Sequence, residues 1–287
     1  ALVAYDTKEE KIAWWDTLIP KEGCRCLAFD EERDTLYALS YPRDHFITYN
    51  VKTRQRRDIG RIGSINGQGI FIDKKHRAYT TNDYGHLVRY TPEKDRLEWS
   101  PEPLPYDRRN QTGWHAVFYD LVASPDRECI YATTWIPQPR LMRIWPHEGE
   151  WPRVEDLGPV TQDRDLTFPH SMFVDHCGGL TFAADGKLYY VASRWRDARY
   201  NPIPPEREER EGVVWRLDPD TLKREEVTLL KHPVGTAQYV SRGAVDHNGD
   251  LFFGYINHRG KPAGIFKVTM PADRKKKNAH LPIRVWG

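Results

Sequence analysis

The chain has 287 residues, and its 43 Lys and Arg nearly balance 41 Asp and Glu, giving a formal net charge of +2. This balance argues against a strongly basic nucleic-acid-wrapping protein, so no nucleic-acid partner is expected. No apolar run approaches the roughly 18 residues of a membrane span, so no membrane partner is expected either. The cellular compartment is left open, and a mature secreted or periplasmic form would fit the absence of a leader.

A repeating unit runs through the chain: an apolar strand, a polar turn, and a second strand that contains an early aromatic residue. These pairs are LAFDEERDTLYALS (27–40), GIFIDKKHRAYTTN (69–82), LVASPDRECIYATT (121–134), GLTFAADGKLYYVAS (179–193) and GAVDHNGDLFFGYIN (243–257). Each segment is short, rich in β-forming residues and bounded by turn residues, which is typical of antiparallel strands.

A third and a fourth strand follow each pair, for example HFITYNV with RRDIGRI (56–62) and RLMRIWP with VEDLGPV (154–160). Repeats of four short strands predict an all-β, β-propeller fold in one domain over residues 1–287. We expect five complete four-stranded blades, the last ending in LPIRVWG (281–287). The N-terminal segment matches a third and fourth strand alone, which suggests a partial blade and a parent propeller of six or seven blades.

In a propeller, the loops before each first strand and after each second strand open on one face, at the mouth of the central channel. The predicted mouth loops contain six histidines, many arginines and exposed aromatic residues, whereas the turns of the other face carry ordinary polar sequences. The histidines are His45, His86, His115, His170, His176 and His258, and the arginines are Arg25, Arg43, Arg140, Arg194, Arg196, Arg199, Arg242 and Arg259.

Three chemical properties of this mouth indicate an acidic saccharide as the ligand. Arginine binds carboxylates through two parallel hydrogen bonds. Trp and Tyr offer flat faces for sugar rings, and His and Tyr are common proton-transfer groups. We therefore expect Trp135, Trp195, Arg196 and His258 to bind substrate.

A propeller with His, Tyr and Arg at its mouth resembles the β-propeller polysaccharide lyases that act on ulvan or oligouronides. The resemblance implies that an Arg or a metal neutralises a uronate carboxylate, a His or Tyr removes the adjacent proton, and a Tyr or His protonates the leaving oxygen. Loop position then suggests His115 or His170 as the base, Tyr200 or Tyr239 as the acid, and Arg194 or Arg242 as the neutralising group.

Two alternatives to a lyase remain open at this point. A metal-dependent hydrolase or lactonase would use carboxylates at the mouth, for which Asp83, Asp120 and Asp175 are available, and no cofactor is otherwise required by the sequence. A non-catalytic propeller would bind a carbohydrate or another partner without turnover. The oligomeric state, and whether a metal is bound, are not specified by these patterns.

Recurring positions have a simpler, structural interpretation. His45 and His86 both begin a third strand, so a structural role is expected for them. Arg89, Arg143, Arg216 and Lys267 share one third-strand position, which suggests a contact between neighbouring blades. The few cysteines are expected to be buried thiols rather than metal ligands.

Overall fold

The computed structural model describes residues 2–63, 67–105, 117–135, 139–160, 174–196, 212–232, 235–236, 239–256 and 264–274. Within these ranges, only the backbone is described at 174–176, 193–196, 231–232, 235–236, 239–241 and 256. The described chain is built from β-strands, with a single 3-10 turn at Ala272–Arg274. It divides into two compact units, one covering Ala1–Pro103 and the other beginning at Leu104.

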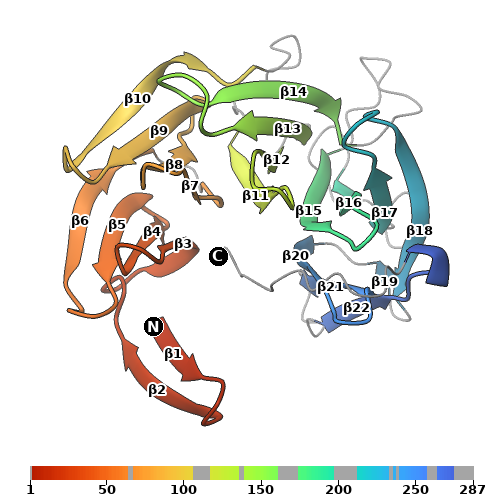
Figure 1. The fold of residues 1–287 in the computed structure, drawn as a ribbon, viewed down its shortest axis with the longest axis horizontal. Helices are drawn as coiled ribbons and strands as arrows, with labels where there is room; N and C mark the ends of the chain where they lie inside the picture. The colour runs from red at the N-terminus through yellow and green to blue at the C-terminus, as the bar shows by residue number, and fades with distance from the viewer. Residues whose placement is uncertain are drawn as a thin grey trace. The chain divides into compact units, whose positions relative to one another are not determined.

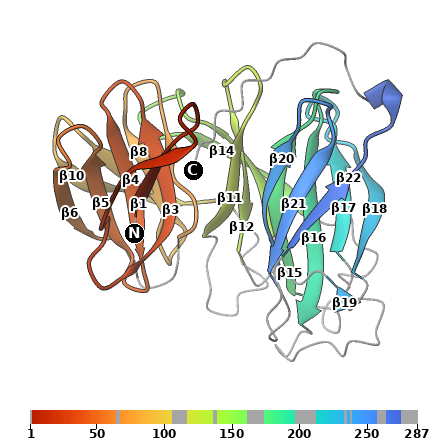
Figure 2. The same ribbon diagram turned by 90° about the horizontal axis from the view of Figure 1, so that it is seen from below.

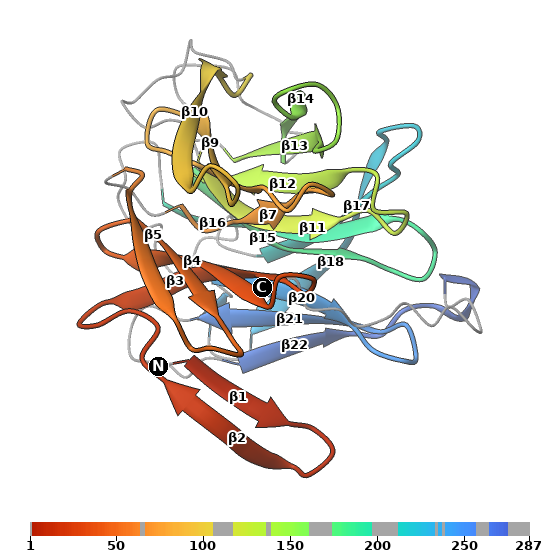
Figure 3. The same ribbon diagram turned by 60° about the vertical axis from the view of Figure 1, so that its left-hand side comes forward.

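The first unit contains a hairpin and two four-stranded antiparallel sheets (Figure 1). The hairpin pairs β1 (Leu2–Asp6) with β2 (Lys11–Asp16), and Figure 3 shows it as a separate two-stranded ribbon. The strands of the two sheets follow one another in chain order. The first sheet consists of β3 (Gly23–Asp30), β4 (Thr35–Tyr41), β5 (His45–Asn50) and β6 (Arg56–Arg61). The second consists of β7 (Phe71–Ile72), β8 (Ala78–Thr81), β9 (His86–Thr91) and β10 (Arg96–Pro103).

The second unit contains three sheets, again with strands in chain order (Figure 2). The first sheet consists of β11 (Phe118–Ala123), β12 (Ile130–Thr134), β13 (Arg140–Trp145) and β14 (Arg153–Pro159). The second consists of β15 (Val174–Phe182), β16 (Leu188–Arg196), β17 (Gly212–Leu217), β18 (Arg224–His232) and β19 (Gly235–Thr236). The third is β20 (Tyr239–Val245), β21 (Leu251–Ile256) and β22 (Gly264–Val268). Consecutive antiparallel pairing of this kind is the topology of propeller blades.

The turn between the first and second strand of each sheet uses a left-handed residue and a polar side chain. His76, Gly186 and Gly249 lie at this turn with φ of 59°, 74° and 82°. The Oδ1 atoms of Asp73 and Asp246 each accept two backbone N–H groups of their turns, at 2.9 Å. These side chains replace the backbone partners that a tight turn lacks, which explains the recurring Asp in the sequence repeat.

The predicted early aromatic of the second strand lies inside the protein in the first four sheets, whereas Phe252 in the last sheet is only partly buried. Tyr37, Tyr79, Tyr131 and Tyr189 are all at most 2% exposed. The cores lie between neighbouring sheets: Tyr131 and Leu141 of one sheet, for example, form a cluster with Leu188 and Tyr190 of the next. The sheet that begins at β15 has such a core on both faces, because Tyr189 and Val191 lie in a second cluster with Leu251 and Phe253, and this explains the near-continuous apolar run of β16.

The sequence of sheets confirms the predicted series of four-stranded units, with two differences: the sheet that begins at β15 has a short fifth strand, β19, and the last sheet lacks a described fourth strand. The N-terminal segment forms two strands, as its match to a third and fourth strand predicted. The sheet β20–β21–β22 has three strands among the described residues, because its predicted fourth strand, 281–287, lies outside them. The prediction of a single domain stays a prediction, since the two units are described separately.

The recurring basic residue of the third strand makes its main contact within its own sheet, so the expected contact between blades is largely wrong. Arg89 lies opposite Glu98 on the fourth strand, with Nη2 3.0 Å from Oε2. Arg143 lies opposite Glu155 in the same way, at 2.7 Å. The register of strands three and four therefore explains the repeat, although Arg143 also donates to the Pro219 carbonyl of the next sheet.

The first strands of the second unit, β11, β15 and β20, lie side by side. Each of them contains a β-bulge near its start, where the pairing with the second strand shifts register. Bulges redirect side chains and are common next to functional sites. The bulge in β3 occupies the corresponding place in the first unit.

We expect Gly243→Ala to destabilise the protein by about 2–3 kcal/mol, because β20 approaches β15 closely at this residue. A Cβ atom on Gly243 would overlap the Gly179 carbonyl oxygen and lie 2.8 Å from its carbon. Thermal unfolding of the variant would measure the loss. Ala244→Ser, at the exposed neighbouring residue, is the control and should change stability by less than about 0.5 kcal/mol.

Candidate functional site

The residues predicted to carry catalysis fall mostly where the structure gives no side chain. His115, His170, Tyr200 and His258 lie outside the described residues. Tyr239, Arg194, Trp195 and Arg196 have a described backbone: Tyr239 begins β20, and the other three end β16. Arg194 pairs with Asp175 and Arg196 with Val174 across β15, so these residues share one end of their sheet. Their roles stay predictions.

Arg242 is the predicted neutralising residue that the structure describes in full. It lies inside the bulge of β20, and its side chain is 48% exposed. Its Nη1 group is ion-paired with Asp120 of β11, which is 2% exposed. Among the described residues no acceptor is seen for its Nε and Nη2 groups, which form the edge of a guanidinium that can pair with a carboxylate.

Asp120 is held by backbone groups as well as by Arg242. Oδ2 accepts the N–H of Leu180 in β15 at 2.9 Å, and Oδ1 accepts the N–H of Leu121 at 2.9 Å. Burial raises the pKa of Asp120, while the charge of Arg242 and these N–H groups oppose the increase. Asp120 thus links the first strands of three sheets and fixes the position of the Arg242 guanidinium.

Trp135 directly follows β12 and is half-buried. Its backbone N–H donates to the Val117 carbonyl at 2.8 Å, at the entry to β11. This contact places Trp135 at the same end of the sheet as the start of β11. Its predicted role in stacking on a sugar is not tested by these contacts.

His45 and His86 have equivalent structural contacts, which confirms the interpretation of their repeat. His45 Nδ1 lies 2.8 Å from Asp58 Oδ2, and His86 Nδ1 lies 2.8 Å from the Ser100 carbonyl. Both partners belong to the fourth strand of the same sheet. Through Nδ1, these histidines therefore join the third strand of each sheet to the fourth.

The sequence reasoning did not single out Asp44, although its loop was among the predicted mouth loops. Asp44 ends the turn between β4 and β5, has a φ of 53° and is 1% exposed. Neither carboxylate oxygen has a hydrogen-bond partner in the described part of the chain. A buried carboxylate in this condition is rare, because the charged form loses its hydration without compensation.

Five further charged side chains lie around this turn, and we call the set the Asp44 cluster: Glu22, Arg25, Arg43, Asp44, Arg61 and Asp83. Burial and the nearby Asp83 raise the pKa of Asp44 to about 7, while Arg25, Arg61 and His45 oppose the increase. A carboxyl with such a pKa exchanges protons near neutrality, and groups of this kind concentrate at functional sites. The sequence signal that could have identified Asp44 is its position just before the third strand, where the next sheet has Gly85.

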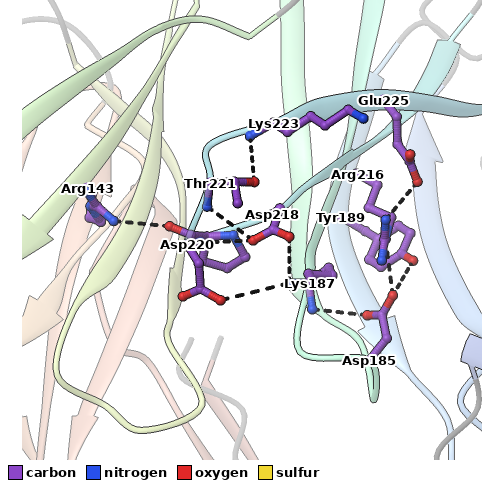
Figure 4. Close-up of polar contacts among 11 residues, drawn as sticks. Arg143, Asp185, Lys187, Tyr189, Arg216, Asp218, Asp220, Thr221, Lys223 and Glu225 are labelled. Atoms are coloured by element: carbon purple, nitrogen blue, oxygen red, sulfur yellow. Dashed lines mark hydrogen bonds and ion pairs between the residues drawn. The ribbon is translucent and has the colours of Figure 1, made fainter.

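The charged side chains around the turn between β15 and β16, in the second unit, are paired, in contrast to the Asp44 cluster. Figure 4 shows Lys187 next to Asp218, with their atoms 2.8 Å apart. Arg216 contacts both Asp185 and Glu225, at 3.1 and 2.8 Å (Figure 4). Each group in this network has a partner of opposite charge, so its role is to hold turns and outer strands together.

Within the described ranges, no three or more His, Cys, Asp or Glu side chains are grouped in a way that could hold a metal ion. The same residues contain no helix long and apolar enough to cross a membrane.

Cys26 and Cys177 are buried, as expected, whereas Cys24 is exposed.

The sequence matches no protein-family model and no curated protein. Solved structures do resemble it. The extracellular domain of BT4673 from B. thetaiotaomicron is 15% identical, with a TM-score of 0.57 over 88% of this chain and 29% of that one. Hydrazine synthase from Kuenenia stuttgartiensis is 12% identical, with a TM-score of 0.58 over 88% of this chain and 67% of that one.

The chain thus spans less than a third of the BT4673 chain that it resembles. At such low identity the likeness concerns the fold alone. Together with the series of antiparallel sheets, it supports the predicted all-β, propeller-type fold. The resemblance to polysaccharide lyases is supported as far as this fold and no further.

Proposed function

We propose that this protein is a propeller that acts on uronic-acid oligo- or polysaccharides by β-elimination, with Arg242 binding the uronate carboxylate. The observation that carries the proposal is the half-exposed guanidinium of Arg242, oriented by the buried Asp120. An arginine fixed in this way is prepared to bind a planar carboxylate without reorganising.

The reaction requires three groups in the proposed mechanism. Arg242 neutralises the carboxylate, which acidifies the proton on the adjacent carbon. His115 or His170 removes this proton as the base, and Tyr200 or Tyr239 protonates the leaving oxygen. The glycosidic bond breaks as a carbon–carbon double bond forms, so no other reactant is needed.

The test is incubation with a panel of uronic-acid polysaccharides, followed by the ultraviolet absorbance of the unsaturated product. We expect absorbance to rise with at least one of them. Arg242→Lys keeps a positive charge beside Asp120 but loses the paired donors, so kcat/KM should fall by roughly tenfold or more. Arg216→Lys, whose partners lie in the satisfied network of Figure 4, is the matched control and should retain activity.

No product with any uronate polymer would reject the lyase proposal. Binding of a polymer without turnover, lost in Arg242→Lys, would instead support the non-catalytic carbohydrate-binding alternative. Turnover that is abolished by a chelator, with no unsaturated product, would support the metal-dependent hydrolase.

A further inference from the structure

The turn between β4 and β5 does not need an aspartate for its conformation. Asp44 occupies the left-handed position before the third strand, and Gly85 occupies the equivalent position of the next sheet with a φ of 77°. Glycine adopts this conformation at lower cost than any other residue. The backbone of the turn is already held, because the Asp44 carbonyl accepts the N–H of Ile62 at 3.0 Å.

Unsatisfied polar atoms gather in the Asp44 cluster. Both oxygens of Asp44, Oε2 of Glu22 and Nε of Arg25 are buried and have no partner among the described residues. The other oxygen of Glu22 lies 3.3 Å from Arg43 Nε, so one half of that carboxylate remains unused. Folding alone gains nothing from leaving charged groups in this condition.

The charges of the cluster favour a neutral ligand group. Glu22, Asp44 and Asp83 carry negative charge, and Arg25, Arg43 and Arg61 carry positive charge, so a metal cation and a phosphate would both meet repulsion. Hydroxyl groups can donate to the free carboxylate oxygens and accept from Arg25. Tyr41, which is 43% exposed and lies 4.8 Å below the Arg25 guanidinium carbon, adds an aromatic face.

We propose that the Asp44 cluster is a binding site for the hydroxyl groups of a neutral sugar ring, with Asp44 as the principal acceptor. The exposed Tyr41 and Arg43 precede Asp44, which places the site at the surface of the first unit. Both Asp44 oxygens are covered in the structure, so binding requires the exposed side chains of this turn to shift. This proposal does not rest on Arg242 or on the elimination reaction.

The test is titration calorimetry with neutral tetrasaccharides derived from cellulose, xylan, mannan and starch. We expect the protein to bind at least one, and Asp44→Asn to weaken that binding by about tenfold or more, since a hydrogen bond to a charged acceptor is lost. Asp34→Asn is the matched control, because Asp34 is also a left-handed aspartate of this sheet, with a φ of 49°, but is paired with Lys52. It should leave binding unchanged.

Three results would overturn the proposal: no binding of any neutral tetrasaccharide, equal binding by Asp44→Asn, or preferential binding of calcium chloride or inorganic phosphate. The Arg242→Lys variant separates this site from the proposed lyase site. Loss of uronate turnover in that variant, with neutral-sugar binding intact, would show two independent sites.

Discussion

Asp44→Asn should raise the stability of the protein at pH 8 by about 4 kcal/mol, a gain that shrinks to well under 1 kcal/mol below pH 4. Burial and Asp83 raise the pKa of Asp44 from 3.8 to about 7 in the folded chain. At about 1.4 kcal/mol for each tenfold change in proton affinity, the difference amounts to about 4 kcal/mol. The melting temperature at pH 8 should rise by roughly 8 °C.

The sign of this effect follows from the proton bound by the folded state. The folded protein holds the Asp44 proton more tightly than the unfolded chain does, so this proton stabilises it below about pH 4. That stability is lost as the pH rises toward 7, where Asp44 ionises against burial and Asp83. Asn never ionises, and it buries a neutral polar group much as the protonated acid does.

Thermal unfolding of both proteins from pH 4 to pH 8 would measure this gain. A lower melting temperature for Asp44→Asn at pH 8 would contradict the argument, because it would mean that Arg25 and Arg61 stabilise an ionised Asp44. Asp34→Asn, which loses the exposed pair with Lys52, should change stability little at any pH. Higher stability combined with lost sugar binding would mark Asp44 as a residue kept for function.

The fold could be predicted from sequence because the same pattern of apolar strands and polar turns recurs in each sheet. Tyr37, Tyr79, Tyr131 and Tyr189 mark the second strands, and all four are buried as the repeat required. Strand pairs of this kind are local in sequence, so alternation and turn residues suffice to identify them. The contact of Arg89 was misassigned because periodicity gives the position of a side chain but not which neighbour it faces.

The candidate sites were less predictable, since they depend on contacts between distant residues. Arg242 was identified from its loop, but its pairing with Asp120 joins residues 122 positions apart and has no sequence signal. Asp44 was missed because burial, rather than residue type, makes it unusual. A comparison of equivalent turn positions between repeats distinguishes Asp44 from Gly85, and it needs the amino-acid sequence alone.

Arg242→Ala should destabilise the protein by about 2–3 kcal/mol, a large effect for a residue whose side chain is half exposed. The loss arises at Asp120, which is 2% exposed and would lose its counter-ion, so that it must either stay charged while buried or take up a proton. The backbone N–H groups of Leu180 and Leu121 remain as donors, and water screens Arg242, so the effect is smaller than for a fully buried pair.

A double-mutant cycle in urea separates this pairing from a simple loss of packing. Asp120→Asn removes the buried charge, so Arg242→Ala should cost less than about 1 kcal/mol in the Asp120→Asn background. The coupling energy should therefore be about 2 kcal/mol. Additive effects of the two substitutions would show that the pair adds little, and Arg242 would then lack the fixed orientation on which carboxylate binding depends. Arg242→Lys should keep most of the stability, which lets activity be compared in a folded protein.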